Sequence, residues 1–186
     1  MRDRLHRNSQ KRIYVDQGIY FITTNTYQSF PFFSRDIFCE LFIAELELCQ
    51  KLKGFTVYGY KINPQHIHLL IQTGEKFDFS NVMHFLKRNF SQNANKMVGD
   101  VHQRRRCASS PLMSAFDDIV EKYKRQFTAK YGIHHKIPPF KWQKSFHFHV
   151  VNNQKDFTNH LRYIDNQWIK HELKENKFCF IAPTLF

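Results

Sequence analysis

Residues 55–73 read FTVYGYKINPQHIHLLIQT, and this stretch decides the fold class. It contains two short runs, 55–63 and 66–73, in which β-branched and aromatic residues are common, and a connection with Pro64 separates them. Two such runs on either side of a short connection are typical of an antiparallel hairpin. We therefore expect two neighbouring strands, the second of which begins at His66.

The rest of the chain adds two strands and four helices to this hairpin. β-branched and aromatic residues also dominate residues 18–27 and 144–151, which predicts a strand in each. Apolar residues recur at helical spacing in four further segments, which predicts amphipathic helices over residues 34–54, 78–98, 114–132 and 153–176. The first of these helices is expected to have Ser34 as its N-cap and to stop at Gly54.

The order of these elements indicates an α+β fold. Strand, helix, strand, strand, helix, strand, helix is the order of the ferredoxin-like split βαβ, which we expect here as a four-stranded antiparallel sheet with helices on one face. The additional helix falls within residues 100–140, which we interpret as an insertion. Residues 1–16 are basic with little periodicity and are expected to form an N-terminal arm. The length of 186 residues fits a single domain, 1–186.

Charge is the main signal in the composition. Twenty-eight Lys and Arg against sixteen Asp and Glu give a formal net charge of +12, which favours a polyanionic partner, nucleic acid first. No apolar run reaches the roughly 18 residues that a membrane-spanning helix needs, and the N-terminus lacks the apolar core of a signal peptide. We therefore expect a soluble, cytoplasmic protein. The scattered cysteines form no C-x-x-C pair and are expected to be buried thiols, at Cys39, Cys49, Cys107 and Cys179.

The paired histidines of the hairpin are the first candidate for chemistry. Side chains alternate along a strand, so His66 and His68 share one face, about 6 to 7 Å apart at the backbone, while Ile67 and Leu69 turn to the other. Two imidazoles at this spacing can converge on a divalent cation, although such a cation needs further ligands. The alternative is a pair of surface histidines. On a strongly basic protein, a metal site suggests phosphate chemistry.

A nucleophile for that chemistry is found in the last predicted helix. No carboxylate accompanies the histidine pair, which argues against a two-metal nuclease and favours covalent catalysis by a side-chain hydroxyl. Tyr163 and Gln167 stand four residues apart and share a helical face. They could present a phenol oxygen to phosphorus and an amide oxygen to the metal. The alternative is that Tyr163 is a partly buried core residue.

A second His-x-His occurs at His147 and His149, in the predicted strand over residues 144–151. Spacing alone does not decide between this pair and His66 with His68. One pair could also support the ligands of the other through hydrogen bonds.

Taken together, these motifs resemble those of the HUH-endonuclease single-tyrosine transposases, especially the REP-associated tyrosine transposase branch. NPQHIHLLI (63–71) is similar to the family's P-x-H-hydrophobic-H-hydrophobic strand, and KWQKSFHFHVV (141–151) is similar to its Trp-Gln pair ahead of a strand that contains His. HLRYIDNQWIKHEL (160–173) resembles the family's Tyr-Ile-x-x-Asn-Pro-x-Lys-His. The resemblance spans roughly residues 14–173, in the same order along the chain.

The resemblance implies a DNA-cleaving site with a nucleophile on the C-terminal helix. Tyr163 would attack single-stranded DNA, form a 5′-phosphotyrosine and leave a 3′-hydroxyl that can later rejoin strands. One Mg²⁺ or Mn²⁺ would be held by His66, His68 and Gln167. Structural or supporting positions would be His149, Trp142 and Gln143. Two departures stand out: Gln167-Trp168 replaces Asn-Pro, and residues 100–140 are longer than the family leads us to expect.

The resemblance also implies partners and a cellular location. The substrate would be single-stranded or hairpin DNA, the protein would be associated with the nucleoid, and a homodimer could use the tyrosine in cis or in trans. Candidate DNA-contacting side chains are Lys87, Arg88, Arg104, Arg105, Arg106 and Lys170. Three alternatives remain open: a non-catalytic module that binds single-stranded nucleic acid on an aromatic sheet, a domesticated transposase, and a replication-initiation nuclease with the same chemistry.

Overall fold

The computed structural model describes residues 12–99 and 111–183, and the predicted hairpin is at its centre. Strand β2 (Thr56–Asn63) pairs antiparallel with β3 (His66–Gln72), with Pro64 and Gln65 in the turn between them. In this register His68 lies opposite Lys61, and His66 lies opposite Asn63. The hairpin prediction is therefore confirmed.

The sheet has five antiparallel strands in the order β4-β1-β3-β2-β5. Strands β1 (Ile19–Asn25) and β4 (His147–Val150) lie within the predicted ranges, and β1 sits between β4 and β3. The expectation of four strands was wrong by one, because β5 (Cys179–Ile181) pairs with β2 at the other edge. A three-residue strand is too short to show the alternation on which sequence prediction depends.

Gly59 of β2 permits this additional strand. A Cβ atom at this position would lie 3.1 Å from the backbone oxygen of Phe180 and 3.3 Å from the side chains of Leu161 and Ile164. Any larger residue would therefore press on both β5 and the C-terminal helix. Glycine in a strand interior often marks such a close approach.

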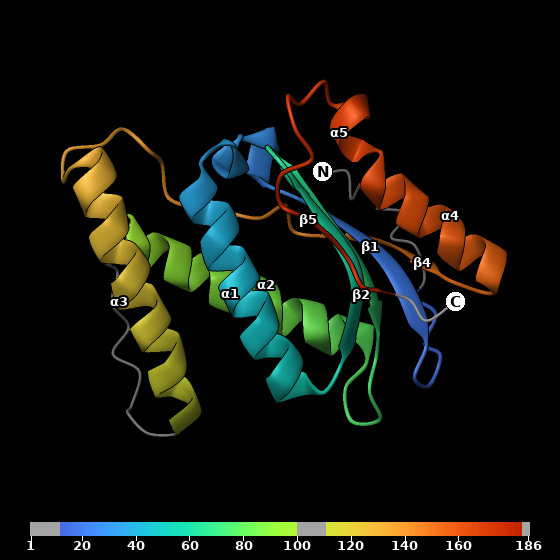
Figure 1. Ribbon diagram of the computed structural model, residues 1–186. Coiled ribbons are helices and arrows are strands. Elements are labelled where there is room, and N and C mark those ends of the chain that lie inside the picture. Colours follow the sequence, from blue (N-terminus) through green and yellow to red (C-terminus); the bar gives the residue numbers. More distant parts are fainter. Residues whose placement is uncertain (1–11, 100–110, 184–186) are drawn as a thin grey trace, which may run out of the picture.

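Helices cover both faces of the sheet, whereas helices on one face were expected. Helices α1 (Asp36–Lys53), α2 (Phe79–Met97) and α3 (Pro111–Tyr131) lie on one side, and α4 (Gln154–Asp165) lies on the other (Figure 1). β3 explains the difference, because its five central residues are all buried. Ile67, Leu69 and Ile71 belong to the core under α1, α2 and α3. Leu70 packs instead against Phe157, Leu161 and Ile164 of α4.

Most helix boundaries agree with the predictions, with two exceptions. α1 ends at Gly54, which has φ of 61°, as expected, but its N-cap is Arg35, and Ser34 closes a short 3-10 turn instead. The predicted helix 153–176 is interrupted: α4 ends at Asp165 and a short α5 (Gln167–Lys170) follows. The Asn176 amide donates to the Asp165 carbonyl, which a continuous helix would use for its own ladder.

The cysteines, the N-terminal arm and the predicted insertion are only partly covered by the described residues. Cys39, Cys49 and Cys179 are free thiols, the first two buried, as predicted, while Cys107 lies outside the described residues. The predicted arm lies mostly outside them too, and of residues 100–140 only 111–140 are described, with α3 as their main element. Across the described residues, no helix is both long enough and apolar enough to cross a membrane.

Candidate active site

His66 and His68 converge on the α4 face of the sheet. Their Nε2 atoms lie 3.1 Å apart, and their rings meet edge-on with centroids 4.8 Å apart. The next residue of β3 on this face, Leu70, packs against α4. The alternation of β3 therefore turns both imidazoles toward the helix that carries Tyr163.

Gln167, the first residue of α5, is a third potential ligand at this point. Its Oε1 atom lies 3.2 Å from His68 Nε2, and the residue is only 1% exposed. Two imidazole nitrogens and one amide oxygen are thus gathered in a small volume, although they come from residues almost 100 positions apart. Such a donor set fits one divalent cation with open positions for water or phosphate oxygens.

Neighbouring polar groups fix the orientation of both rings. Thr23 Oγ1, on β1 opposite His68, lies 2.8 Å from His68 Nδ1, and Asn63 Nδ2 lies 3.0 Å from His66 Nε2. A hydrogen bond between the Nδ1–H of His68 and the Thr23 hydroxyl leaves the Nε2 lone pair of His68 toward His66 and Gln167. For His68 this is the arrangement in which histidine ligands are usually held, whereas Asn63 contacts the Nε2 atom of His66 itself.

Burial keeps the two imidazoles neutral. It lowers the pKa of His68 to about 3, and the neighbouring His66 adds to this shift. It lowers the pKa of His66 to about 4, and His171 and Lys170 add to that shift. Both rings therefore retain a lone pair at neutral pH, which is the form that binds metal.

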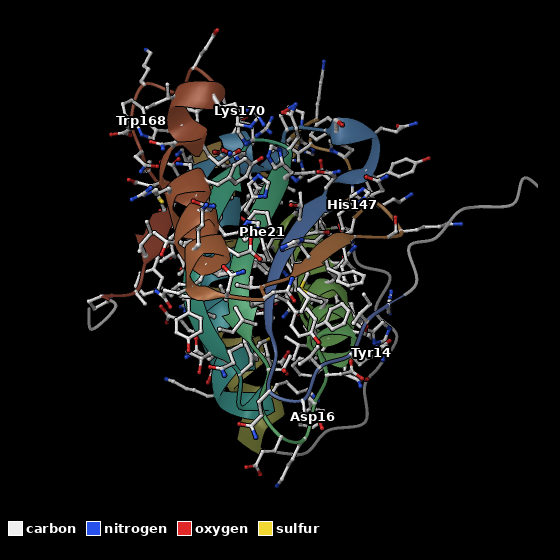
Figure 2. The ribbon with its side chains drawn as sticks, turned by 90° about the vertical axis from the view of Figure 1, so that its right-hand side faces the viewer. Tyr14, Asp16, Phe21, His147, Trp168 and Lys170 are labelled. Atoms are coloured by element: carbon white, nitrogen blue, oxygen red, sulfur yellow. The ribbon has the colours of Figure 1, made fainter. Side chains whose placement is uncertain are left out.

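Tyr163 lies beside this cluster and belongs to the same chain. Its ring contacts His68 edge-on with centroids 5.2 Å apart, and it meets Phe21 in the same way at 5.6 Å. The residue is 38% exposed, so the phenol can be reached from solvent. Figure 2 views this side of the molecule, with Phe21 of β1 near the centre and Lys170 above it on α5. Tyr163 and the histidine pair thus meet within one chain.

The second His-x-His pair occupies another place on the same sheet face. His149 Nε2 donates to Asp156 Oδ2 of α4 at 2.8 Å. Among the described contacts of His149, none is to His66 or His68. His147 is exposed on β4, opposite Thr23, on the right of Figure 2. His149 was expected to support the metal ligands, but it makes no direct contact with His66 or His68.

Trp142 and Gln143 lie further from the cluster. The Trp142 ring packs among buried aromatic side chains, including Phe90 and Phe140. Gln143 pairs with Asn25 through backbone and side-chain hydrogen bonds, and Asn25 lies opposite His66 in the sheet. Gln143 therefore contacts Asn25 of β1, the strand next to the one that carries His66, and not His66 itself.

The predicted DNA-contacting residues have different surroundings. Lys87 donates to the carbonyls of Gln143 and Ser145, and burial lowers its pKa to about 8. Its contact with DNA stays a prediction. Arg88 is exposed. Lys170 lies next to Tyr163. The arginines Arg104, Arg105 and Arg106 lie outside the described residues.

Comparison with known proteins identifies the relatives of this chain. Residues 21–110 match the family model described as "Transposase IS200 like". A protein of Haemophilus influenzae, provisionally named a REP-associated tyrosine transposase, is 26% identical over 165 residues, which cover 88% of this chain and 77% of that protein. Over residues 21–110 this chain is similar to the IS200-like transposases. The matched range includes His66 and His68, and it ends before Tyr163 and Gln167.

Two solved structures of transposases are also similar. A REP-associated tyrosine transposase bound to a REP hairpin aligns with a TM-score of 0.49 and 18% identity, over 88% of this chain and 73% of that one. A transposase provisionally assigned in Deinococcus radiodurans aligns with a TM-score of 0.36 and 12% identity, over 90% and 99% of the two chains.

Sequence reasoning missed three groups that the structure places near the cluster. They are Thr23, which bonds to His68, Lys61, which lies opposite His68, and the pair Asp156 and His160, which meets His149. Thr23 and Lys61 depend on the register between strands, which no local pattern reveals. Asp156 and His160 are four residues apart on a helix, a spacing that could have been noticed.

Proposed function

We propose that this chain cleaves and rejoins DNA strands with Tyr163 as its nucleophile. The observation that carries the proposal is the meeting, within one chain, of Tyr163 with the convergent donor atoms of His66, His68 and Gln167. These donors would hold one Mg²⁺ or Mn²⁺, which when bound would polarise an oxygen of the scissile phosphate.

The side chains of the site account for the transfer step. The Oη atom of Tyr163 attacks phosphorus, the bond from phosphorus to the 3′-oxygen breaks, and the released 3′-oxygen takes up a proton. The product is a 5′-phosphotyrosine and a free 3′-hydroxyl. The phenol proton can leave to water because Tyr163 is partly exposed. Attack by a 3′-hydroxyl on the phosphotyrosine reverses the step and joins two strands.

The proposed substrate is single-stranded or hairpin DNA. The net charge of +12 favours a nucleic acid, and a similar transposase has been solved with a REP hairpin. Because Tyr163 already lies beside the histidines of its own chain, a homodimer is not needed to complete the site, and we propose that the tyrosine acts in cis.

The alternative of a non-catalytic module that binds single strands by stacking has less support. Such modules present aromatic side chains on an open sheet face. Here α4 covers the face that carries Phe21, and the Phe21 ring stacks on His160 and meets Tyr163 edge-on. This ring is therefore not free to receive a base.

A covalent-adduct assay tests the proposed function. The wild-type chain, incubated with Mn²⁺ and a labelled hairpin oligonucleotide with single-stranded flanks, should give a band that resists denaturation by detergent. The band should disappear with a chelator, with Tyr163→Phe, and with His66→Ala combined with His68→Ala. Tyr27→Phe, at another exposed tyrosine, is the matched control and should retain the band. An adduct that persists in Tyr163→Phe would overturn the assignment.

A further inference from the structure

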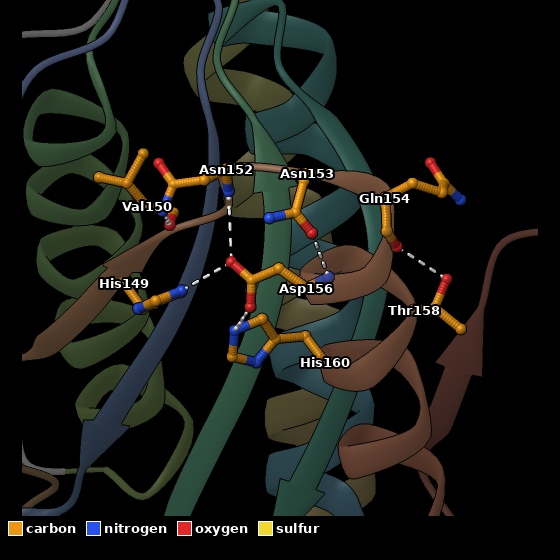
Figure 3. A network of polar contacts seen from close by, with 8 residues as sticks. All are labelled: His149, Val150, Asn152, Asn153, Gln154, Asp156, Thr158 and His160. Atoms are coloured by element: carbon orange, nitrogen blue, oxygen red, sulfur yellow. Dashed lines mark hydrogen bonds and ion pairs between the residues drawn. The ribbon is translucent and has the colours of Figure 1, made fainter.

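A second cluster of potential metal ligands lies next to the candidate active site. It consists of His149 on β4 with Asp156 and His160 on α4, and their ligand atoms all lie within 4.8 Å of one another. Figure 3 shows the Asp156 carboxylate between the two imidazoles. Its Oδ2 atom lies 2.8 Å from His149 Nε2, and its Oδ1 atom lies 3.3 Å from His160 Nε2.

The two elements hold these groups in a defined arrangement. Asp156 and His160 are four residues apart, so they share one face of α4. His149 is opposite Phe21 in the sheet, which places it on the face that α4 covers. The Asn152 amide also donates to Asp156 Oδ2, and Asn153 caps the helix at the Asp156 amide. The carboxylate is therefore held by backbone as well as by side chains.

One atom of the cluster lacks a satisfactory partner. His160 Nε2 is buried and makes no hydrogen bond of good geometry within the described residues, although it faces the Asp156 carboxylate. The two imidazole rings lie with centroids 5.0 Å apart. A ligand shared between them would satisfy this nitrogen, and that observation is independent of the spacing of the residues.

We propose that His149, Asp156 and His160 bind a divalent transition-metal cation such as Zn²⁺. Two imidazole nitrogens and one carboxylate oxygen are a donor set typical of Zn²⁺ sites. Zinc bonds to nitrogen and oxygen are about 2.0 to 2.2 Å long, so two ligand atoms of one ion can be about 4 Å apart at most. The His149 side chain is 50% exposed and can move the short distance required. The fourth position would remain open to water.

The site would fix the position of the helix that carries Tyr163. Strand β4 is an edge strand, and the cation would link it to α4. The link would be made at His160, which is three residues before Tyr163 on the same helix. The Phe21 ring separates the two clusters: it stacks on His160 with centroids 4.3 Å apart and on His68 with centroids 5.4 Å apart. The proposed role is structural. It does not depend on the proposed cleavage activity.

The test uses the chain with His66→Ala and His68→Ala, so that the candidate active site cannot bind the probe. The chain carries no histidine tag, and Zn²⁺ is titrated by calorimetry and by thermal denaturation. About one equivalent of Zn²⁺ should bind and should raise the melting temperature. Adding His149→Ala should weaken binding about tenfold or more and abolish the rise in melting temperature. Adding His147→Ala, on the same strand but outside the cluster, should change neither.

Two outcomes would overturn the proposal. One is the lack of Zn²⁺ binding in the His66→Ala and His68→Ala chain; the other is binding that His149→Ala leaves unchanged. If His149→Ala does not fold, as judged by circular dichroism, Asp156→Asn serves in its place because it keeps the size of the side chain. Co²⁺ gives a second readout, since the visible absorption typical of a tetrahedral site should appear and should be lost in the same variants. Since this background lacks the active-site histidines, the result is independent of cleavage.

Discussion

The Nζ atom of Lys170 lies 3.3 Å from the hydroxyl of Tyr163, and the same ammonium lies 5.3 Å from the centre of the tyrosine ring. The two residues are seven positions apart, and the interruption at Asn166 lies between them. Lys170 was expected to contact the DNA backbone. Its place beside the phenol oxygen suggests in addition a role in stabilising negative charge on that oxygen during transfer.

Replacing Lys170 should therefore slow the chemical step more than it weakens binding. We expect Lys170→Ala to lower the single-turnover rate of adduct formation about 10- to 100-fold, because an electrostatic contact to the reacting oxygen is lost from a partly exposed site. Lys174→Ala, at an exposed lysine further along the chain, is the control. A change in DNA affinity alone, with an unchanged rate at saturating DNA, would show that Lys170 only binds the backbone.

Acid should destabilise the metal-free chain through its neutral histidines. The folded-state pKa values of His66 and His68, about 4 and about 3, lie below the ordinary value near 6.5. Between pH 6.5 and 4 the unfolded chain binds protons that the folded chain does not, so stability is full above pH 6.5 and falls as pH is lowered. The loss by pH 4 should be on the order of 3 kcal/mol for each histidine, or about 6 kcal/mol for the pair, in urea denaturation. With both histidines replaced by Ala, the decline should be much smaller; an unchanged decline would contradict this assignment.

Glu45 should have the opposite effect, because it lowers stability as the pH rises from about 4.5 to 8. It is fully buried in α1, and neither carboxylate oxygen has a hydrogen bond of good geometry within the described residues. Burial raises its pKa to about 8, although the neighbouring Asn93 amide opposes the shift. The folded chain thus holds a proton that the unfolded chain releases above pH 4.5, so stability falls between about pH 4.5 and 8. Glu45→Gln should match the wild type at pH 5 and exceed its unfolding free energy at pH 8 by on the order of 3 kcal/mol.

A neighbouring carboxylate provides the control for that experiment. Glu47 is on the same helix but exposed, so Glu47→Gln should leave the pH dependence of stability as it is in the wild type. Equal pH profiles for the wild type and Glu45→Gln would mean that Glu45 is ionised in the folded chain.

Lys61 should hold the C-terminal strand in place. Its buried ammonium donates to Asn176 Oδ1 at 2.9 Å and to the Lys177 carbonyl at 2.6 Å, just before β5. Lys61→Met would leave these acceptors unpaired, at a cost of about 1 to 3 kcal/mol. The Cys179 thiol of β5 should then react faster with a thiol reagent, about tenfold or more, while the buried Cys39 and Cys49 stay protected. Equal rates at Cys179 in the two proteins would show that β5 does not depend on Lys61.

Local sequence patterns were sufficient for most of the elements, but they missed β5, the break after α4 and the arrangement of the faces. The hairpin at residues 55–73, the strand containing His147 and the three helices of one layer follow from periodicity, and all form. The position of α4 on the opposite face follows from Leu70, which is one apolar residue in a strand that is buried on both sides. From the sequence, one such residue does not tell whether a strand has both faces buried or only one face buried.

The candidate site was predictable where its parts lie in recognisable motifs. His66, His68, Tyr163 and Gln167 were each singled out, and the structure brings them together. The contact of Lys170 with Tyr163 depends on the turn at Asn166, beside which Asn176 donates to the Asp165 carbonyl. Thr23 reaches His68 only through the pairing of β1 with β3. Contacts of this kind are set by tertiary structure and leave no local signal.

The most direct test of the account is to identify the residue that carries the DNA. Wild-type protein is trapped with a hairpin oligonucleotide in Mn²⁺, digested with a protease and a nuclease, and the modified peptide is sequenced by mass spectrometry. We expect a nucleotide attached through a 5′-phosphate to Tyr163, in the peptide that follows Arg162. Attachment to another residue, or strand cleavage with no covalent peptide, would contradict it.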